Sequence, residues 1–218
     1  MIYTIVSGSM IGTFLIGKYI QIKYINWYLL FVLSMNIYNL HNIPFIYTDD
    51  YLFSDIQPYP HLIQLTNCVN LFLMIDFRNH LTNYEMIFHH ISCIVGMTIS
   101  LSGFNVGISN NCIKNEYTTA WLALATLSLK YEKYQRYNSI LITIFIYTFF
   151  FYRVVPCSMI MYRIMVNYTL ITRNIITIIQ FLAFTIHCII QYLWFFRIFV
   201  IIYNTYIPYK NDKFRLVY

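Results

Sequence analysis

Charged side chains are scarce in this chain. Only 10% of its 218 residues are Asp, Glu, Lys or Arg, whereas an ordinary globular domain has about 25%. Hydrophobic residues make up 59% of the chain, and the mean hydropathy is +0.58. This number of charged side chains is too small to cover the surface of a water-soluble domain. The composition therefore indicates an integral membrane protein.

The signatures of several enzyme classes are also missing. The chain has no GxSxG motif of a serine hydrolase, and its six glycines form no phosphate-binding loop. Its histidines do not form the repeated boxes that a di-iron site requires. The cysteines are odd in number, scattered and without a CxxC pair: they are Cys68, Cys93, Cys112, Cys157 and Cys188. The sequence therefore predicts no bound metal, no cofactor and no disulfide framework.

Long apolar runs dominate what is present. They extend over roughly 16 to 30 residues, near the length that crosses a hydrocarbon core as a helix, and the short alternating segments of a membrane barrel are absent. The sequence predicts an all-α fold, a polytopic transmembrane helical bundle of about seven helices in a single domain over residues 1–218. The expected spans are residues 2–17, 25–39, 61–75, 86–101, 116–129, 139–165 and 175–203.

The net charge of +6 is distributed unevenly among the loops. Nine basic residues follow the first, third, fifth and seventh spans, and they are Lys18, Lys23, Arg78, Lys130, Lys133, Arg136, Lys210, Lys213 and Arg215. Three lie in the opposite loops: Lys114, Arg163 and Arg173. This asymmetry predicts a cytosolic C-terminus. The sequon at Asn167 falls on the other side, as glycosylation requires. No basic stripe indicates nucleic acid as a partner.

Several ionisable residues interrupt the apolar runs, most densely in NYEMIFHHISCIVG at residues 83–96. The set comprises Asp76, Glu85, His89, His90, Glu116, Arg153, His187 and Arg197. A central Arg or Asp costs about 2.5 to 3.5 kcal/mol on insertion scales, so such residues face a partner or a wet cavity. We expect a polar cavity inside the bundle, with Arg153 facing it. Glu85 lies one helical turn before His89, where its carboxylate can orient the imidazole.

The residues alone leave open a purely structural alternative. In that alternative, the polar groups form an interhelical hydrogen-bond network that only fixes helix packing. His187 and Arg197, on the last span, fit a structural or interface role better than a catalytic one.

Five segments, in order, resemble the TLC domain, the homology domain of the TRAM, LAG and CLN proteins. They are WYLLFVLSMNIYN (27–39), FLMIDF (72–77), YEMIFHHISCIVG (84–96), NEYTTAWLAL (115–124) and FFFYRVVPCSMIMY (149–162). The resemblance covers about residues 20–205. It implies a helical bundle in the endoplasmic reticulum or a related endomembrane, enclosing a cavity for a lipid or acyl chain.

The resemblance also implies roles for the ionisable residues. The lipid-binding set would be Asp76, Glu85, His89, His90, Glu116 and Arg153. In the ceramide synthase branch, the histidine pair serves acyl transfer from acyl-CoA to a sphingoid base. This chain has NEYTTAWLALATLSLK at residues 115–130 in place of that branch's histidine and aspartate signature. The preferred prediction is a non-synthase protein that binds, transports or senses membrane lipids. The alternative is an acyltransferase that uses His89 and His90, with acyl-CoA as co-substrate.

Overall fold

The structure is a computed structural model, and it describes residues 46–54, 62–67, 83–171 and 174–206. All regular secondary structure in these ranges is helical, which confirms the all-α fold class. The expected spans at residues 2–17 and 25–39 lie outside the described residues. Of the expected span at 61–75, the structure describes a helical turn at 62–67.

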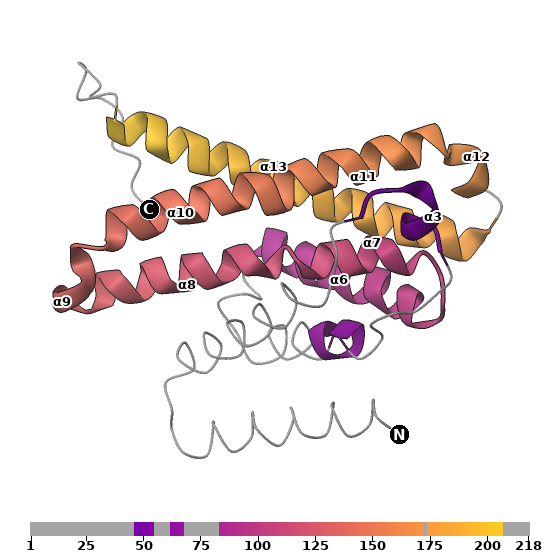
Figure 1. Cartoon of the computed structure of the whole chain (residues 1–218), viewed down its shortest axis with the longest axis horizontal. Helices are drawn as coiled ribbons and strands as arrows, with labels where there is room; N and C mark the ends of the chain where they lie inside the picture. Colours follow the sequence, from indigo (N-terminus) through magenta and orange to yellow (C-terminus); the bar gives the residue numbers. More distant parts are fainter. Residues whose placement is uncertain (1–45, 55–61, 68–82, 172–173, 207–218) are drawn as a thin grey trace, which may run out of the picture.

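Four long helical units match the last four expected spans. They are α6 (Tyr84–Leu101), α8 (Glu116–Lys130), the rod formed by α10 (Asn138–Phe149), η1 (Phe150–Val154) and α11 (Val155–Val166), and α13 (Ile175–Tyr206). The short helix α9 (Glu132–Gln135) joins α8 to α10, and α12 (Tyr168–Ile171) follows α11. In Figure 1, the rod and α13 cross the whole length of the molecule, while α8 runs beside α10. Helix α6 packs chiefly against α13.

Two local features of the sequence shape these helices. The side chain of Asn83 caps α6, because its Oδ1 accepts hydrogen bonds from the backbone N–H groups of Glu85 (3.1 Å) and Met86 (3.4 Å). Pro156 stands in the first turn of α11, where it has no N–H to offer the preceding turn. The turn before it is the π-helix η1, which closes its hydrogen bonds over five residues instead of four.

A short buried helix, α7 (Val106–Ile113), lies between α6 and α8, where the sequence analysis expects only a loop. It begins after Asn105, whose φ of 47° lies in the left-handed region. Helix α7 packs against α3 (Asp49–Leu52). Its polar residues Asn110 and Asn111 are almost wholly buried, so hydropathy alone does not reveal it as part of the core.

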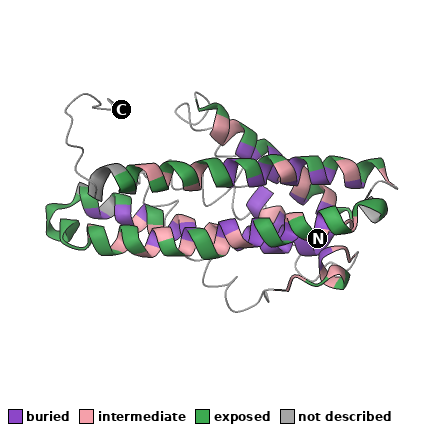
Figure 2. Ribbon diagram, turned by 90° about the horizontal axis from the view of Figure 1, so that it is seen from above, coloured by how far each residue is buried: buried purple, intermediate pink, exposed green. Residues whose placement is uncertain are grey.

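Burial is concentrated where the helices meet, and the outer faces are exposed (Figure 2). Many of these outward side chains are large and apolar, for example Tyr147, Leu182 and Phe196. In the described part of the chain, two helical stretches, 138–166 and 175–201, are long and apolar enough to cross a membrane. An apolar exterior on helices of this length suits contact with lipid chains.

The polar cavity that the sequence predicts is not seen among the described residues. A cavity of about 20 Å³ lies between α6, α7 and α13, and it is lined by apolar side chains together with Ser92, Ser109, Gln180 and His187. This volume suits one water-sized sphere. Polar side chains in the described part of the interior contact one another, as Asn105, Gln180 and Ser100 do.

Candidate functional site

Arg153 is the centre of a buried hydrogen-bond network that joins η1 to α8 and α13. Its Nε donates to the backbone carbonyl oxygen of Asn115 (3.1 Å) and to the Thr118 hydroxyl. Its Nη1 donates to Gln191 Oε1 (3.0 Å), and its Nη2 donates to the Thr119 hydroxyl (2.7 Å). The side chain is 5% exposed. Arg153 therefore lies in the protein interior, but the polar cavity that it is expected to face is not seen among the described residues, so that part stays a prediction. The hydrogen bonds offset the cost of burying its charge.

The network has a partly exposed edge on α8. The Thr119 hydroxyl donates to Glu116 Oε2 (3.0 Å), so one hydroxyl connects the Arg153 guanidinium with a carboxylate. Glu116 and Thr119 are half-buried, whereas Thr118 is fully buried. A polar group approaching the network from outside therefore meets Glu116 and Thr119 first.

The adjacent histidines are both buried, at 5% and 4% exposure for His89 and His90. The His89 ring stacks on His187, with 5.0 Å between ring centroids, and it also lies 5.0 Å from the Trp194 ring. The ring of His90 is 5.3 Å from that of His89 and tilted by 59°. The two imidazoles thus present different faces, as expected from the 100° step between neighbouring helical residues.

Gln191 connects the imidazoles to the guanidinium. Its Nε2 lies 3.3 Å from His187 Nε2 and 3.5 Å from His89 Nδ1, while its Oε1 accepts from Arg153. Asn115 Nδ2 also reaches His187 Nε2, at 3.1 Å. Four segments that are far apart in sequence therefore contribute to one polar cluster.

The hydrogen-bond partners of Glu85 differ from the predicted one, His89. Its carboxylate accepts two hydrogen bonds of 2.6 Å from Arg197 and one of 3.1 Å from Trp194 Nε1. It is therefore directed toward α13, and its connection with His89 runs through the Trp194 ring. The physical reason is charge: a guanidinium, which is always protonated, is a strong, bidentate partner for a carboxylate.

The sequence places His187 in the ionisable set with a structural role but does not indicate its contact with His89, and it does not indicate Gln191 at all. A usable signal existed, because the two residues are four apart within the apolar run of α13 and so share one helix face. No comparable sequence signal marks Asn115 or Trp194. Asp76, the remaining predicted site residue, lies outside the described residues.

Helices with apolar outer faces and a buried polar network define a polytopic α-helical membrane protein. The sequence pattern of the TLC domain matches residues 2–200, so the chain belongs to the TLC domain family. This confirms the resemblance seen in the sequence. Comparison with curated proteins and with solved structures gave no match.

Proposed function

We propose that this protein binds membrane lipids at the Glu116 edge of the Arg153 network, and thereby transports or senses them and influences lipid homeostasis. The observation that supports this most is a guanidinium buried among polar partners that reach a half-exposed carboxylate and hydroxyl. Membership of the TLC domain family supports a lipid-related role for a membrane protein.

The edge offers hydrogen-bond acceptors backed by a buried cation. The Glu116 carboxylate accepts, the Thr119 hydroxyl already gives its proton to Glu116, and the Arg153 guanidinium lies behind them. Such a set suits a lipid head with hydroxyl or amide groups, or a zwitterionic one. The apolar outer faces of α10 and α13 suit the acyl chains. His89 belongs to the same proposed site because the Gln191 amide joins it to Arg153. His90 is included because its ring lies 5.3 Å from that of His89.

The proposed location is the endoplasmic reticulum or a related endomembrane, with the C-terminus in the cytosol. The arrangement of the rod supports the orientation. Lys133 and Arg136 lie at the α9 end of the bundle, and Asn167 lies at the opposite end, after α11 (Figure 1). Basic residues at one end and a sequon at the other agree with the charge asymmetry.

The test is a bound-lipid measurement. Wild-type protein and the Arg153→Gln, His89→Ala and His90→Ala variants are purified, and their co-purifying lipids are extracted and quantified by mass spectrometry. Ser158→Ala serves as a control, because it removes a hydrogen bond to Tyr192 (2.9 Å) on the same helices but outside the network. We expect the network variants to lose a lipid class that the control retains. If folded network variants keep the same lipids in the same amounts, the network only fixes packing.

No observation in the structure favours the acyltransferase alternative. It requires an imidazole with suitable basicity, so His89→Gln and His90→Gln should abolish acyl transfer. A lipid binder requires only hydrogen bonding and should partly tolerate these replacements. An acyl-CoA assay on the purified protein distinguishes the two functions.

A further inference from the structure

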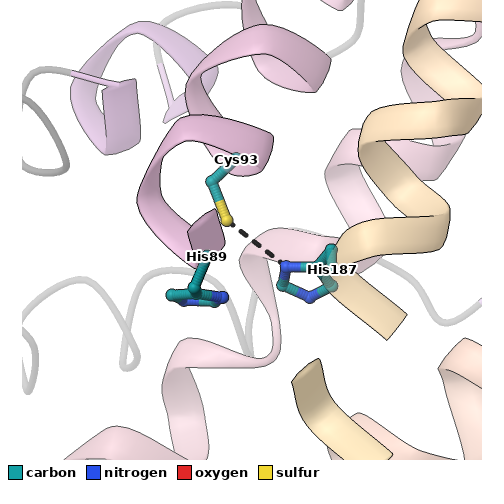
Figure 3. Close-up of side chains that lie close together, drawn as sticks. All are labelled: His89, Cys93 and His187. Carbon is teal, nitrogen blue, oxygen red and sulfur yellow. Dashed lines mark hydrogen bonds between the residues drawn. The ribbon is translucent and has the colours of Figure 1, made fainter. Parts of the chain in front are cut away.

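Two imidazoles and one thiol meet beside the small cavity, in a grouping that the sequence analysis does not anticipate. His89 and Cys93 come from α6, one helical turn apart, and His187 faces them from α13 (Figure 3). The possible ligand atoms of these three residues all lie within 4.8 Å of one another. We propose that His89, Cys93 and His187 bind a monovalent copper ion.

The spacing of the donors fits a metal centre. Cys93 Sγ and His187 Nδ1 are 3.4 Å apart. Metal bonds of about 2.3 Å to sulfur and 2.0 Å to nitrogen place these atoms roughly 3.5 to 3.7 Å apart. The ligand atoms lie within 4.8 Å of one another, so the His89 nitrogen has to approach by at most about 1.5 Å when the ion binds. Cys93 and His187 also line the 20 Å³ cavity, which provides space beside the ion.

The choice of ion follows from charge and softness. A divalent ion on one thiolate and two imidazoles leaves a net positive charge, and the buried Arg153 guanidinium is close by through Gln191. Monovalent copper on the same ligands is neutral, so its burial costs less. Thiolate ligands also favour this soft ion, and three donors suffice for it, whereas structural zinc requires four. Met97, which lines the same cavity, adds a thioether nearby.

Binding replaces one proton by the ion. The Cys93 thiol loses its proton to the solvent buffer as the sulfur–copper bond forms, and no electron is transferred because copper enters as the monovalent ion. When His187 binds through Nδ1, its own proton must lie on Nε2 and needs an acceptor. Asn115 already lies beside this Nε2. Among the described residues, the buried Oδ1 of Asn115 has no hydrogen-bond partner, so a flip of this amide supplies that acceptor. Gln191 Nε2, which lies 3.3 Å from the same nitrogen, then has to turn its N–H away.

The test is an anaerobic titration of the purified full chain with monovalent copper in competition with bicinchoninate. We expect one ion per chain in the wild type, and about 100-fold weaker binding or more in Cys93→Ser and His187→Gln, because losing an outer-shell partner alone costs 10- to 100-fold. The control is Cys157→Ser, which removes a buried thiol that packs in a different cluster with Cys188. It should bind like the wild type.

A second measurement identifies the ligands in the wild type itself, so it does not depend on whether any variant folds. Copper X-ray absorption on the wild-type complex should show one sulfur and two imidazole ligands. The proposal is overturned if the wild type does not compete for copper, if folded Cys93→Ser binds normally, if only Cys157→Ser loses binding, or if two sulfurs and no imidazole are seen. Tighter binding of zinc overturns the choice of ion. The inference does not rest on lipid binding, because Cys93→Ser leaves the Glu116 edge intact.

Discussion

Gly107 lies where α7 passes over the backbone of α3. A Cβ at this position would stand 2.1 Å from the Tyr51 carbonyl oxygen and 2.9 Å from the Leu52 Cα. The obstacle is backbone and not a movable side chain, so the two helices would have to separate. Gly96, on α6, has nothing within 4 Å of its position for a Cβ. The two glycines therefore form a matched pair for mutation.

We predict that Gly107→Ala destabilises the protein by about 1–3 kcal/mol or more through overpacking. Gly96→Ala should be neutral or stabilising by up to about 1 kcal/mol, because alanine favours the helix. Thermal unfolding in detergent, followed with a fluorophore that reacts with newly exposed cysteines, measures both. Equal stability of the two variants would contradict the close approach of α7 and α3.

Lys114 lies between α7 and α8, and its buried surroundings make the stability of the protein depend on pH. Burial lowers the pKa of its ammonium group from 10.5 to about 7. The unfolded chain keeps the proton up to its ordinary pKa, whereas the folded chain releases it near pH 7. Unfolding therefore takes up a proton between these values, and stability rises with pH across this window.

We predict that Lys114→Met is more stable than the wild type at pH 7, and that the difference shrinks by pH 9. The wild type should gain up to about 1.4 kcal/mol per pH unit from this group, and the variant should gain none from it. Melting temperatures of both proteins at pH 6, 7, 8 and 9 provide the measurement. Parallel curves would show that the ammonium group is solvated in the folded protein.

The π-helix η1 is the element that carries Arg153 to its partners on α8 and α13. A guanidinium makes several hydrogen bonds in fixed directions, and a lysine ammonium cannot reproduce this geometry. On the same rod, Arg163 pairs with Asp49 at 3.6 Å, but about two fifths of each side chain is exposed. The rod thus holds one buried and one surface arginine. Replacing either by lysine keeps the positive charge and removes the guanidinium, so the two replacements show whether the guanidinium geometry matters at each site.

We predict that Arg153→Lys lowers stability by about 3 kcal/mol, because buried partners lose their bonds while a charge stays inside. Arg163→Lys should change stability by about 1 kcal/mol or less, as for other exposed ion pairs. Thermal unfolding of the two variants under identical conditions tests this. Similar losses would show that Arg153 acts only as a charge.

At the element level, the sequence predicts the long helices because each is a long apolar run. The prediction fails for α7, because VGISNNCI at residues 106–113 has eight residues and three polar side chains. It is incomplete for the site, because the partners of Glu85 come from α13, more than one hundred residues later. Pairings between distant helices depend on packing, which hydrophobic periodicity does not specify.

For the whole molecule, the charge asymmetry leads to a prediction about orientation. A C-terminal tag should be digested by protease in sealed microsomes, because we place this end in the cytosol. An N-terminal tag should be protected until the membrane is permeabilised, because seven spans put the termini on opposite sides. The reverse pattern would invert the orientation, and equal behaviour of the tags would indicate an even number of spans.

The π-helix also affects the spacing of residues along the rod. Its wide turn contains one residue more than an α-helical turn, so the segment Phe150–Val154 acts as a one-residue insertion. Deleting Phe151 would let this turn close as an α-helical turn, and α10 and α11 would nearly keep their directions, because the wide turn already absorbs the extra residue. The side chains of η1, Arg153 among them, are the ones that the deletion would turn relative to their partners on α8 and α13. The extra residue therefore bears on how the guanidinium is aimed, and not on how the two halves of the rod pack.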